Sequence, residues 1–124
     1  MICVFFLFCS LIINSPTVPI SEGYVSQFTY DVFVAHNHLD GKYFSEIEIG
    51  DMLRYYSDEW NDYKVTDIRK MQAITPALFL EGDTYYTVPQ IYQKIYSRDL
   101  VLQTCIYKDG DPAWGRLFVI AEEQ

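Results

Sequence analysis

The sequence predicts a mainly β domain, a barrel or a sandwich, with one or two short helices. Runs of β-branched and aromatic residues recur along the chain, and turn signals that contain Gly, Pro and Asp separate them. Only residues 88–98 space their apolar side chains as a helix does. Half of the 124 residues are apolar and 17% are aromatic, so one globular domain with a substantial core is expected.

The N-terminal segment carries an apolar run, MICVFFLFCSLII, over residues 1–13. This run is shorter than the ~20 residues that a bilayer span needs. A secretory signal begins with a basic residue, whereas the first basic residue here is Lys42. Two interpretations remain: the remnant of a membrane anchor or signal, which we favour, or a buried strand. Residues 14–23 form a connector with Pro and Ser, and residues 24–124 form the folded domain.

The first half of this domain is predicted from local patterns, in chain order. Residues 24–36 favour one or two strands with a break near residues 30–31. A loop follows that contains the Asp40-Gly41 turn signal, and residues 44–52 indicate a short helical turn that ends at Gly50. Residues 52–71 predict a hairpin whose turn lies near residues 58–62.

The second half is expected to be irregular over residues 73–87, with Pro76 and an acidic turn at residues 81–83. A helix is predicted over residues 88–98, with Pro89 in its first turn. Residues 100–107 and 115–123 are predicted to be strands joined by the turn KDGDP. Period-2 alternation in the first of them puts Leu100 and Leu102 on one face, which we expect to be the core side, and Cys105 on the other.

Charge and cysteine usage exclude several classes of function. Seventeen acidic residues against nine basic ones give a net charge of −8, which repels phosphate backbones and argues against nucleic-acid binding. Three cysteines, with no Cys-x-x-Cys pair, give neither a disulfide framework nor a metal-ligand spacing. We therefore expect no metal and no cofactor.

Cys105 is the only thiol outside the apolar N-terminal run. A lone cysteine is most often a small buried hydrophobe. If the last two strands pair across their turn, however, Arg116 comes close to it, and a guanidinium suits a developing oxyanion. The two histidines, His36 and His38, add an imidazole. Together these groups are the parts that cysteine-based acyl transfer needs.

These residues resemble the sortases, the surface-protein transpeptidases of bacteria. Val101-Leu102-Gln103-Thr104-Cys105 is similar to the family's nucleophile strand, Thr-Leu-x-Thr-Cys, and departs from it only at Val101. Arg116, eleven residues after the cysteine, matches the family's arginine at the start of the next strand. The segment FVAHN resembles the family's histidine segment, and KYFSEIEIGDML and YKVTDIRKM resemble the segments that follow it. The resemblance covers roughly residues 30–123.

The resemblance implies a sortase-like β-barrel and a cysteine transpeptidase. Cys105 would attack the threonine carbonyl of a Leu-Pro-x-Thr-Gly-type sorting signal, His36 would protonate the leaving amine, and Arg116 would stabilise the oxyanion. Thr104 would offer its hydroxyl to the substrate. The acceptor would be an amine of a cell-wall peptide or a pilin lysine, and the location extracytoplasmic, at the membrane and cell surface. His38 competes with His36, and the family motif favours His36.

Calcium binds some sortases through loop carboxylates, which makes Glu81 and Asp83 candidates, although a solvated acidic turn is the favoured interpretation. Only 35 residues precede His36, so the barrel is expected to lack some N-terminal strands. The alternatives are an inactive or truncated sortase-like binding domain, another cysteine peptidase, and an acidic β domain with a buried Cys105. Papain-like enzymes place the cysteine before the histidine, and L,D-transpeptidases carry a Ser-His-Gly-Cys run; neither pattern occurs here.

Overall fold

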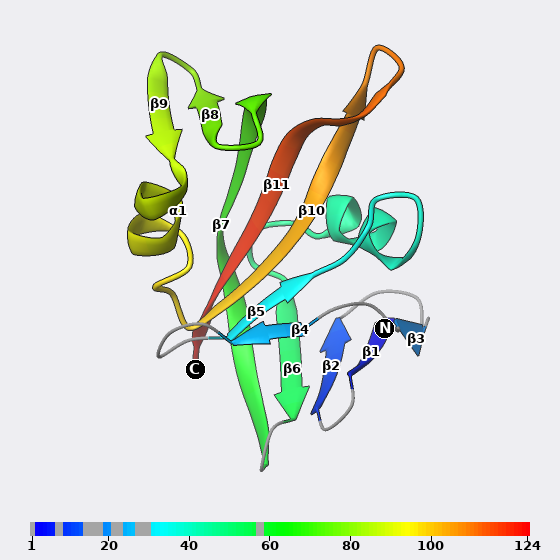
Figure 1. Ribbon diagram of the computed structural model, residues 1–124. Helices are drawn as coiled ribbons and strands as arrows, with labels where there is room; N and C mark the ends of the chain where they lie inside the picture. The colour runs from blue at the N-terminus through cyan, green and yellow to red at the C-terminus, as the bar shows by residue number, and fades with distance from the viewer. Residues whose placement is uncertain (1, 7–8, 14–18, 21–23, 27–30, 57–58) are drawn as a thin grey trace.

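The computed structural model describes residues 2–6, 9–13, 19–20, 24–26, 31–56 and 59–124. Within them, eleven strands form one sheet, accompanied by the 3-10 helix η1 (Asp40–Glu46) and the helix α1 (Val88–Lys94) (Figure 1). The prediction of a mainly β fold with few short helices is therefore confirmed. The strands are β1 (Ile2–Phe6), β2 (Cys9–Ile13), β3 (Pro19–Ile20), β4 (Tyr24–Ser26), β5 (Asp31–Val34), β6 (Met52–Tyr56), β7 (Trp60–Thr75), β8 (Leu78–Glu81), β9 (Thr84–Thr87), β10 (Leu100–Lys108) and β11 (Asp111–Glu123).

The sheet is open, with the order β3-β1-β2-β6-β7-β11-β10-β5-β4, and β8 and β9 extend it from β7. Most neighbours pair antiparallel, but β5 runs parallel to β10. The centre of the sheet is the hairpin β10–β11, which was predicted from its turn. Asp109 and Gly110 in this turn both have positive φ angles, of 52° and 82°. Two such residues form the tight turn that suits the right-handed twist of a hairpin.

Both faces of the β10–β11 hairpin are covered, and each face carries its own core cluster. We call the side that packs against η1, β6 and the start of β7 the η1 face; Leu102 and Leu117 belong to it. The side that packs against α1 and β8 is the α1 face, with Val101 and Phe118. Figure 1 shows the two helices on opposite sides of the central strands. The expectation of a single core face along residues 100–107 was therefore incomplete, because α1 buries Val101 as fully as the η1 face buries Leu102.

The segment after His36 differs from the prediction. The loop expected there is the helix η1, and the helical turn expected over residues 44–52 has already ended at Glu46. The reason lies at Gly41, which the sequence suggested as a turn residue. A Cβ at this position would meet the side-chain oxygen of Thr104 at 2.3 Å and the carbonyl oxygens of Ala35 and His36 at 2.7 Å. Gly41 therefore allows η1 to approach β10 closely.

Residues 73–87 are also more regular than predicted. The strand β7 continues to Thr75, and β8 and β9 form a hairpin around Gly82, whose φ angle is +59°. The helix predicted from residue 88 is confirmed as α1, although it ends at Lys94. Its first turn is closed by Gln90, whose Oε1 accepts a hydrogen bond from the backbone N–H of Thr87 at 2.8 Å.

The strands β1 and β2 lie within the apolar run 1–13, and β3 lies within the connector 14–23. Residues 1, 7–8, 14–18 and 21–23 of these two segments lie outside the described residues. Two antiparallel pairings, β1 with β2 and β2 with β6, attach the run to the sheet. No helix among the residues that the structure describes is long and apolar enough to cross a membrane.

Candidate active site

Cys105 and Arg116 are direct partners across the β10–β11 hairpin. Directly opposed residues on antiparallel strands point to the same face, and both side chains fall on the α1 face by alternation from Val101 and Phe118. Both are partly buried. The register thus confirms the expected pairing of the two strands and sets the thiol and the guanidinium side by side.

His36 follows the end of β5, which pairs in parallel with β10. The register joins Val34 to Gln103, and the backbone N–H of Ala35 donates to the Gln103 carbonyl at 3.0 Å. Val34 packs against the α1-face cluster and Ala35 belongs to the η1-face cluster, so the alternation of β5 continues to this point. His36 and Cys105 each lie two residues beyond this last printed pair, and Arg116 is the partner of Cys105 on β11. We refer to His36, Cys105 and Arg116, which follow or belong to three neighbouring strands, as the row.

The segment that carries His36 is attached to the β10–β11 hairpin. The side-chain amide of Asn37 donates to the Pro112 carbonyl at 2.9 Å. The His36 carbonyl accepts hydrogen bonds from the backbone N–H groups of Leu39 at 3.1 Å and Gly41 at 2.9 Å. The sequence pointed to Asn37 only as a family pattern, whereas the structure gives it a physical role. It ties the histidine segment to the turn that precedes Arg116.

The Arg116 guanidinium is held from its own hairpin and from β8. Its Nη1 donates to the Gly115 carbonyl at 3.0 Å, and its Cζ lies 5.7 Å from the centre of the Phe79 ring. A cation over an aromatic face is attracted by the ring's electrons. Both contacts leave guanidinium N–H groups that can donate to an oxyanion, since this side chain carries five donors.

Thr104 lies on the other side of β10. Its side chain is 3% exposed, and its partner across the hairpin is Leu117 of the η1-face cluster. Among the described residues its Oγ1 has no hydrogen-bond partner. Alternation along a strand, which the sequence already implies, directs neighbouring side chains to opposite faces. Thr104 also lines a cavity whose wall includes Cys105, so the expectation that its hydroxyl meets the substrate stays a prediction.

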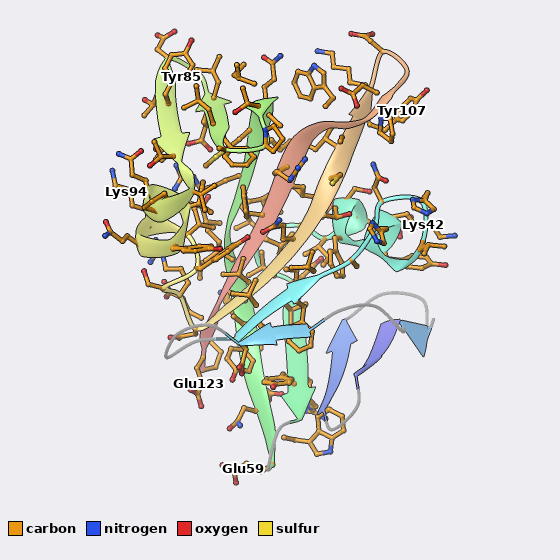
Figure 2. All side chains as sticks on the ribbon, viewed as in Figure 1. Lys42, Glu59, Tyr85, Lys94, Tyr107 and Glu123 are labelled. Atoms are coloured by element: carbon orange, nitrogen blue, oxygen red, sulfur yellow. The ribbon has the colours of Figure 1, made fainter. Side chains whose placement is uncertain are left out.

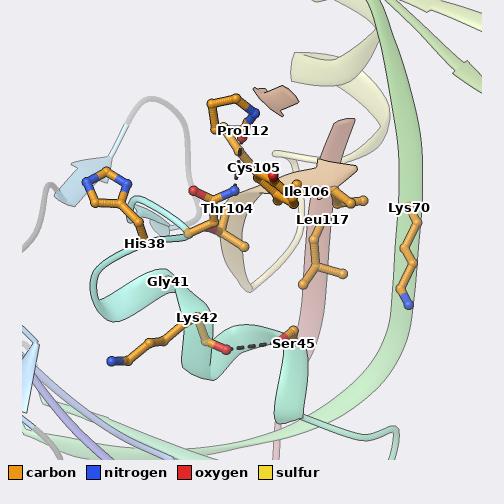
Figure 3. Close-up of a pocket in the computed structure, with 12 residues that line it drawn as sticks. His38, Gly41, Lys42, Ser45, Lys70, Thr104, Cys105, Ile106, Pro112 and Leu117 are labelled. Carbon is orange, nitrogen blue, oxygen red and sulfur yellow. Dashed lines mark hydrogen bonds between the residues drawn. The ribbon is translucent and has the colours of Figure 1, made fainter. Parts of the chain in front are cut away.

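A cavity of about 610 Å³ opens beside the end of β10, where β5 no longer pairs with it (Figure 3). His38 and Lys42 lie on one side of it and Lys70 on the other, with the β10 and β11 residues between them. Its lining contains no acidic residue, and consists of Asn37, His38, Gly41, Lys42, Ser45, Lys70, Thr104, Cys105, Ile106, Tyr107, Pro112 and Leu117. Cys105 thus belongs both to the row on the α1 face and to the wall of this cavity.

The two histidines lie close together but in different surroundings. Their ring centres are 5.5 Å apart, and both side chains are exposed. His38 lines the cavity that Cys105 also lines, whereas His36 lies two residues after the last residue of β5 that pairs with β10. The choice of His36 over His38 stays a prediction that rests on the family motif.

No sequence pattern singled out the side chains of Gln103 and Tyr96. Tyr96 follows α1, and its hydroxyl donates a hydrogen bond to Oε1 of Gln103, two residues before Cys105. Burial under α1 and the neighbouring Tyr92 raise the pKa of the Tyr96 hydroxyl to about 12, against the opposing effects of the Gln103 hydrogen bond and the positive charge of Arg116. Tyr96 therefore stays protonated and remains a donor at physiological pH.

Glu81, a calcium candidate from the sequence, is paired with Arg69. The Arg69 Nε donates to a Glu81 carboxylate oxygen at 3.0 Å, Nη2 contacts the other oxygen, and Nη2 also donates to the Tyr86 hydroxyl at 3.0 Å. The hydrogen bonds to Glu81 and Tyr86 and the negative charge of the carboxylate raise the pKa of Arg69, against the opposing effect of partial burial. Glu81 thus joins β7 to β8 and is not a solvated turn residue. No group of three metal-ligating side chains occurs in the described part of the chain.

Exposed aromatic side chains mark the hairpin ends near the row. Tyr85 is 56% exposed at the end of β8–β9, and Tyr107 is 65% exposed near the end of β10–β11. Figure 2 shows both at the same end of the molecule.

The chain was compared with known proteins. No protein-family model and no curated protein matches it. Solved structures do match. Sortase C1 of Streptococcus agalactiae, in its complex with MTSET, aligns with 80% of this chain and 47% of its own at 18% identity, with a TM-score of 0.51. Sortase C1 from Streptococcus suis gives 20% identity, 80% and 50% coverage, and a TM-score of 0.51.

Sortase C-1 from Streptococcus pneumoniae aligns with 80% of this chain and 46% of its own, at 18% identity and a TM-score of 0.51. The chain therefore spans about half the length of the sortase structures that it matches. At this level of identity the likeness concerns the fold. Together with the order of the strands and the row of His36, Cys105 and Arg116, it leads to one conclusion: the chain has a sortase-like fold.

Proposed function

We propose that this chain is a cysteine transpeptidase of the sortase type, with Cys105 as nucleophile, His36 as general acid and Arg116 as oxyanion stabiliser. The observation that carries the proposal is the direct pairing of Cys105 with Arg116 across β10 and β11, beside the parallel strand β5 that His36 follows. Acyl transfer by a thiol requires a nucleophile, a proton donor for the leaving group and a cationic donor for the oxyanion. Neighbouring strands supply these three kinds of group, which supports the proposal.

The reaction proceeds in two steps. The Cys105 thiolate attacks the carbonyl carbon of the threonine in a Leu-Pro-x-Thr-Gly-type peptide, and Arg116 donates hydrogen bonds to the oxyanion that forms. The bond to the glycine nitrogen breaks, and His36 gives its proton to the leaving amine. An incoming amine then attacks the thioester, the carbon–sulfur bond breaks, and His36 takes up the proton that the amine loses. The products are a new amide and the free thiol.

The partners follow from this chemistry. The acyl donor is a sorting-signal peptide of a surface protein, and the acceptor is an amine of a cell-wall peptide or a lysine of a pilin. Such substrates lie outside the cytoplasm, so we place the protein at the cell surface.

Mass spectrometry of the acyl-enzyme tests the proposal. The chain with Cys3 and Cys9 replaced by Ser is incubated with a panel of Leu-Pro-x-Thr-Gly peptides and with an amine. The expected products are a thioester on Cys105 and an amine-linked peptide, both absent from Cys105→Ala. Peptide cleavage that survives Cys105→Ala would defeat the proposal. Binding of a peptide without turnover would instead support an inactive sortase-like binding domain.

Paired variants assign the general acid. His36→Ala is expected to slow turnover by about 10²–10⁴-fold, since that is the usual contribution of general acid–base catalysis. His38→Ala is the matched control and should leave turnover close to that of the parent. The reverse ranking would move the acid role to His38 and the cavity.

Thr104→Val tests the placement of Thr104. The change removes a buried hydroxyl without a partner among the described residues, so the variant should be at least as stable as the parent. Turnover should fall, because Thr104 lines the cavity that Cys105 also lines. Unchanged turnover in a variant that stays folded would remove Thr104 from the substrate-binding set.

A further inference from the structure

On the α1 face, a second set of three paired residues lies directly beside His36, Cys105 and Arg116. Val34, Gln103 and Phe118 are joined by the same strand registers, two residues before the reactive row on β10. Gln103 is the one polar side chain among these three, and it is partly exposed. Its neighbours on this face are apolar, since Val34 and Phe118 both pack in the α1-face cluster. A carboxamide in such a position needs an oriented partner for each end.

Tyr96 supplies the partner for one end. Its hydroxyl donates to Oε1 of Gln103. The Tyr96 ring is fixed by stacking on Tyr92 at 5.3 Å and by an edge contact with Phe118 at 6.3 Å, measured between ring centres. Because this hydroxyl donates to Oε1 of Gln103, the amide nitrogen Nε2 keeps its two N–H donors for another group.

The spacing between Gln103 and Cys105 matches the repeat of an extended peptide. Two residues along a strand rise about 6.6–6.8 Å, and carbonyl groups on one side of an extended peptide recur at the same interval. A peptide that lies extended along β10 with one carbonyl at Cys105 therefore places a second carbonyl over Gln103. This second carbonyl belongs to the residue two positions from the scissile one.

We propose that Gln103 binds the acyl-donor peptide by donating from its side-chain amide to the backbone carbonyl two residues before the scissile bond, and that Tyr96 positions it. The inference rests on the proposed function and deepens it. Gln103 is a substrate-binding residue in this scheme, and Tyr96 is a positioning residue, because it acts only through Gln103. In a Leu-Pro-x-Thr-Gly peptide the carbonyl in question is that of the proline.

Gln103→Met tests the hydrogen bond at nearly constant side-chain length. We expect kcat/KM for the peptide to fall by about 3–10-fold, the range for one neutral hydrogen bond, with most of the change in KM. The second-order rate of Cys105 alkylation by iodoacetamide should stay the same, because this small reagent makes no contact with Gln103. An equal loss in alkylation would mean that Gln103 acts on the thiol, and unchanged peptide kinetics would mean that it does not touch the substrate; either result overturns the inference.

A modified peptide identifies the contacted carbonyl. A thioamide in place of the proline carbonyl weakens the acceptor, so the parent chain should lose kcat/KM with this peptide. Gln103→Met should show no further loss, since its contact is already absent. Equal sensitivity of both chains to the thioamide would overturn the assignment.

Tyr96→Phe and Tyr92→Phe form a matched pair for the positioning role. Both remove one hydroxyl from the same stacked pair of rings, but only Tyr96 donates to Gln103. We expect Tyr96→Phe to weaken peptide turnover, Tyr92→Phe to leave it unchanged, and the double change Tyr96→Phe with Gln103→Met to lose no more than Gln103→Met alone. Losses that multiply in the double variant would overturn the coupling. A parent chain that forms no thioester with any peptide would defeat the proposed function itself, a result distinct from an active parent that tolerates Gln103→Met.

Discussion

Gly41→Ala puts the packing of η1 on β10 to the test. In an open helix this substitution stabilises the chain by about 0.5–1 kcal/mol, since glycine is the more flexible residue. Here the new methyl would lie 2.3 Å from Oγ1 of Thr104 and 2.7 Å from the carbonyl oxygens of Ala35 and His36. Two of these three atoms belong to the backbone at the end of β5, and one of them accepts the Gly41 N–H at 2.9 Å.

The clash can be relieved only if η1 moves away from β10 or the end of β5 shifts with His36. Overpacking of this kind costs about 1–3 kcal/mol, enough to reverse the sign of the helix-propensity gain. We expect Gly41→Ala to lower the free energy of unfolding by this amount. It should also slow thioester formation on Cys105, because the new methyl would press against the backbone carbonyl of His36.

Urea unfolding followed by circular dichroism measures the first effect, and the acyl-enzyme assay measures the second. Glu46→Ala is the matched control, since it adds the same residue at an exposed position of the same helix. The double variant Gly41→Ala with Thr104→Ala should recover part of the stability, because one of the three close contacts is removed. A Gly41→Ala chain as stable as the parent would refute the close approach of η1 to β10.

Two further predictions concern stability. Arg69→Ala should lower the free energy of unfolding by about 1–2 kcal/mol, because it leaves the partly buried Glu81 carboxylate unpaired. Arg54→Ala, which breaks a solvent-exposed pair with Asp62, should leave the urea midpoint unchanged, and equal effects of the two changes would contradict this ranking. The raised pKa of Tyr96, about 12 in the folded chain against about 10 when unfolded, predicts a stability that is full below pH 10 and falls as the pH rises toward 12. The loss should reach about 2–3 kcal/mol and be smaller in Tyr96→Phe, as measured by urea unfolding between pH 9 and 12; parallel pH profiles for the two chains would show that Tyr96 is not the cause.

Much of the fold was predictable because its signals are local. The Asp109-Gly110 turn flanked by two apolar runs specified the central hairpin, and hence the pairing of Cys105 with Arg116. Helical spacing after Thr87 specified α1. The family resemblance favoured His36, which lies two residues after the last pair of β5 with β10.

The predictions from the sequence failed where the role of a residue depends on a contact with a residue far away in the chain. Asp40-Gly41 has the composition of a turn, yet Gly41 is required by the contact with Thr104, 63 positions later. The core face of β10 was assigned from the alternation of apolar and polar residues. Alternation cannot identify a single core face here, because both faces of this strand contribute to core clusters. Residues 78–87 lack the alternation of a strand pair, and their hairpin is stabilised by the ion pair between Arg69 and Glu81.

By itself the sequence determined the class of the fold and the hairpin that sets Cys105 opposite Arg116. These features depend on side-chain type, on period-2 alternation and on turn chemistry, all of which act over a few residues. Only the tertiary structure decided that Gly41 packs against Thr104, that Asn37 ties the histidine segment to Pro112, and that the Tyr96 hydroxyl donates to Gln103. Each of these depends on contacts between elements far apart in the chain, and such contacts exist only once the sheet has assembled.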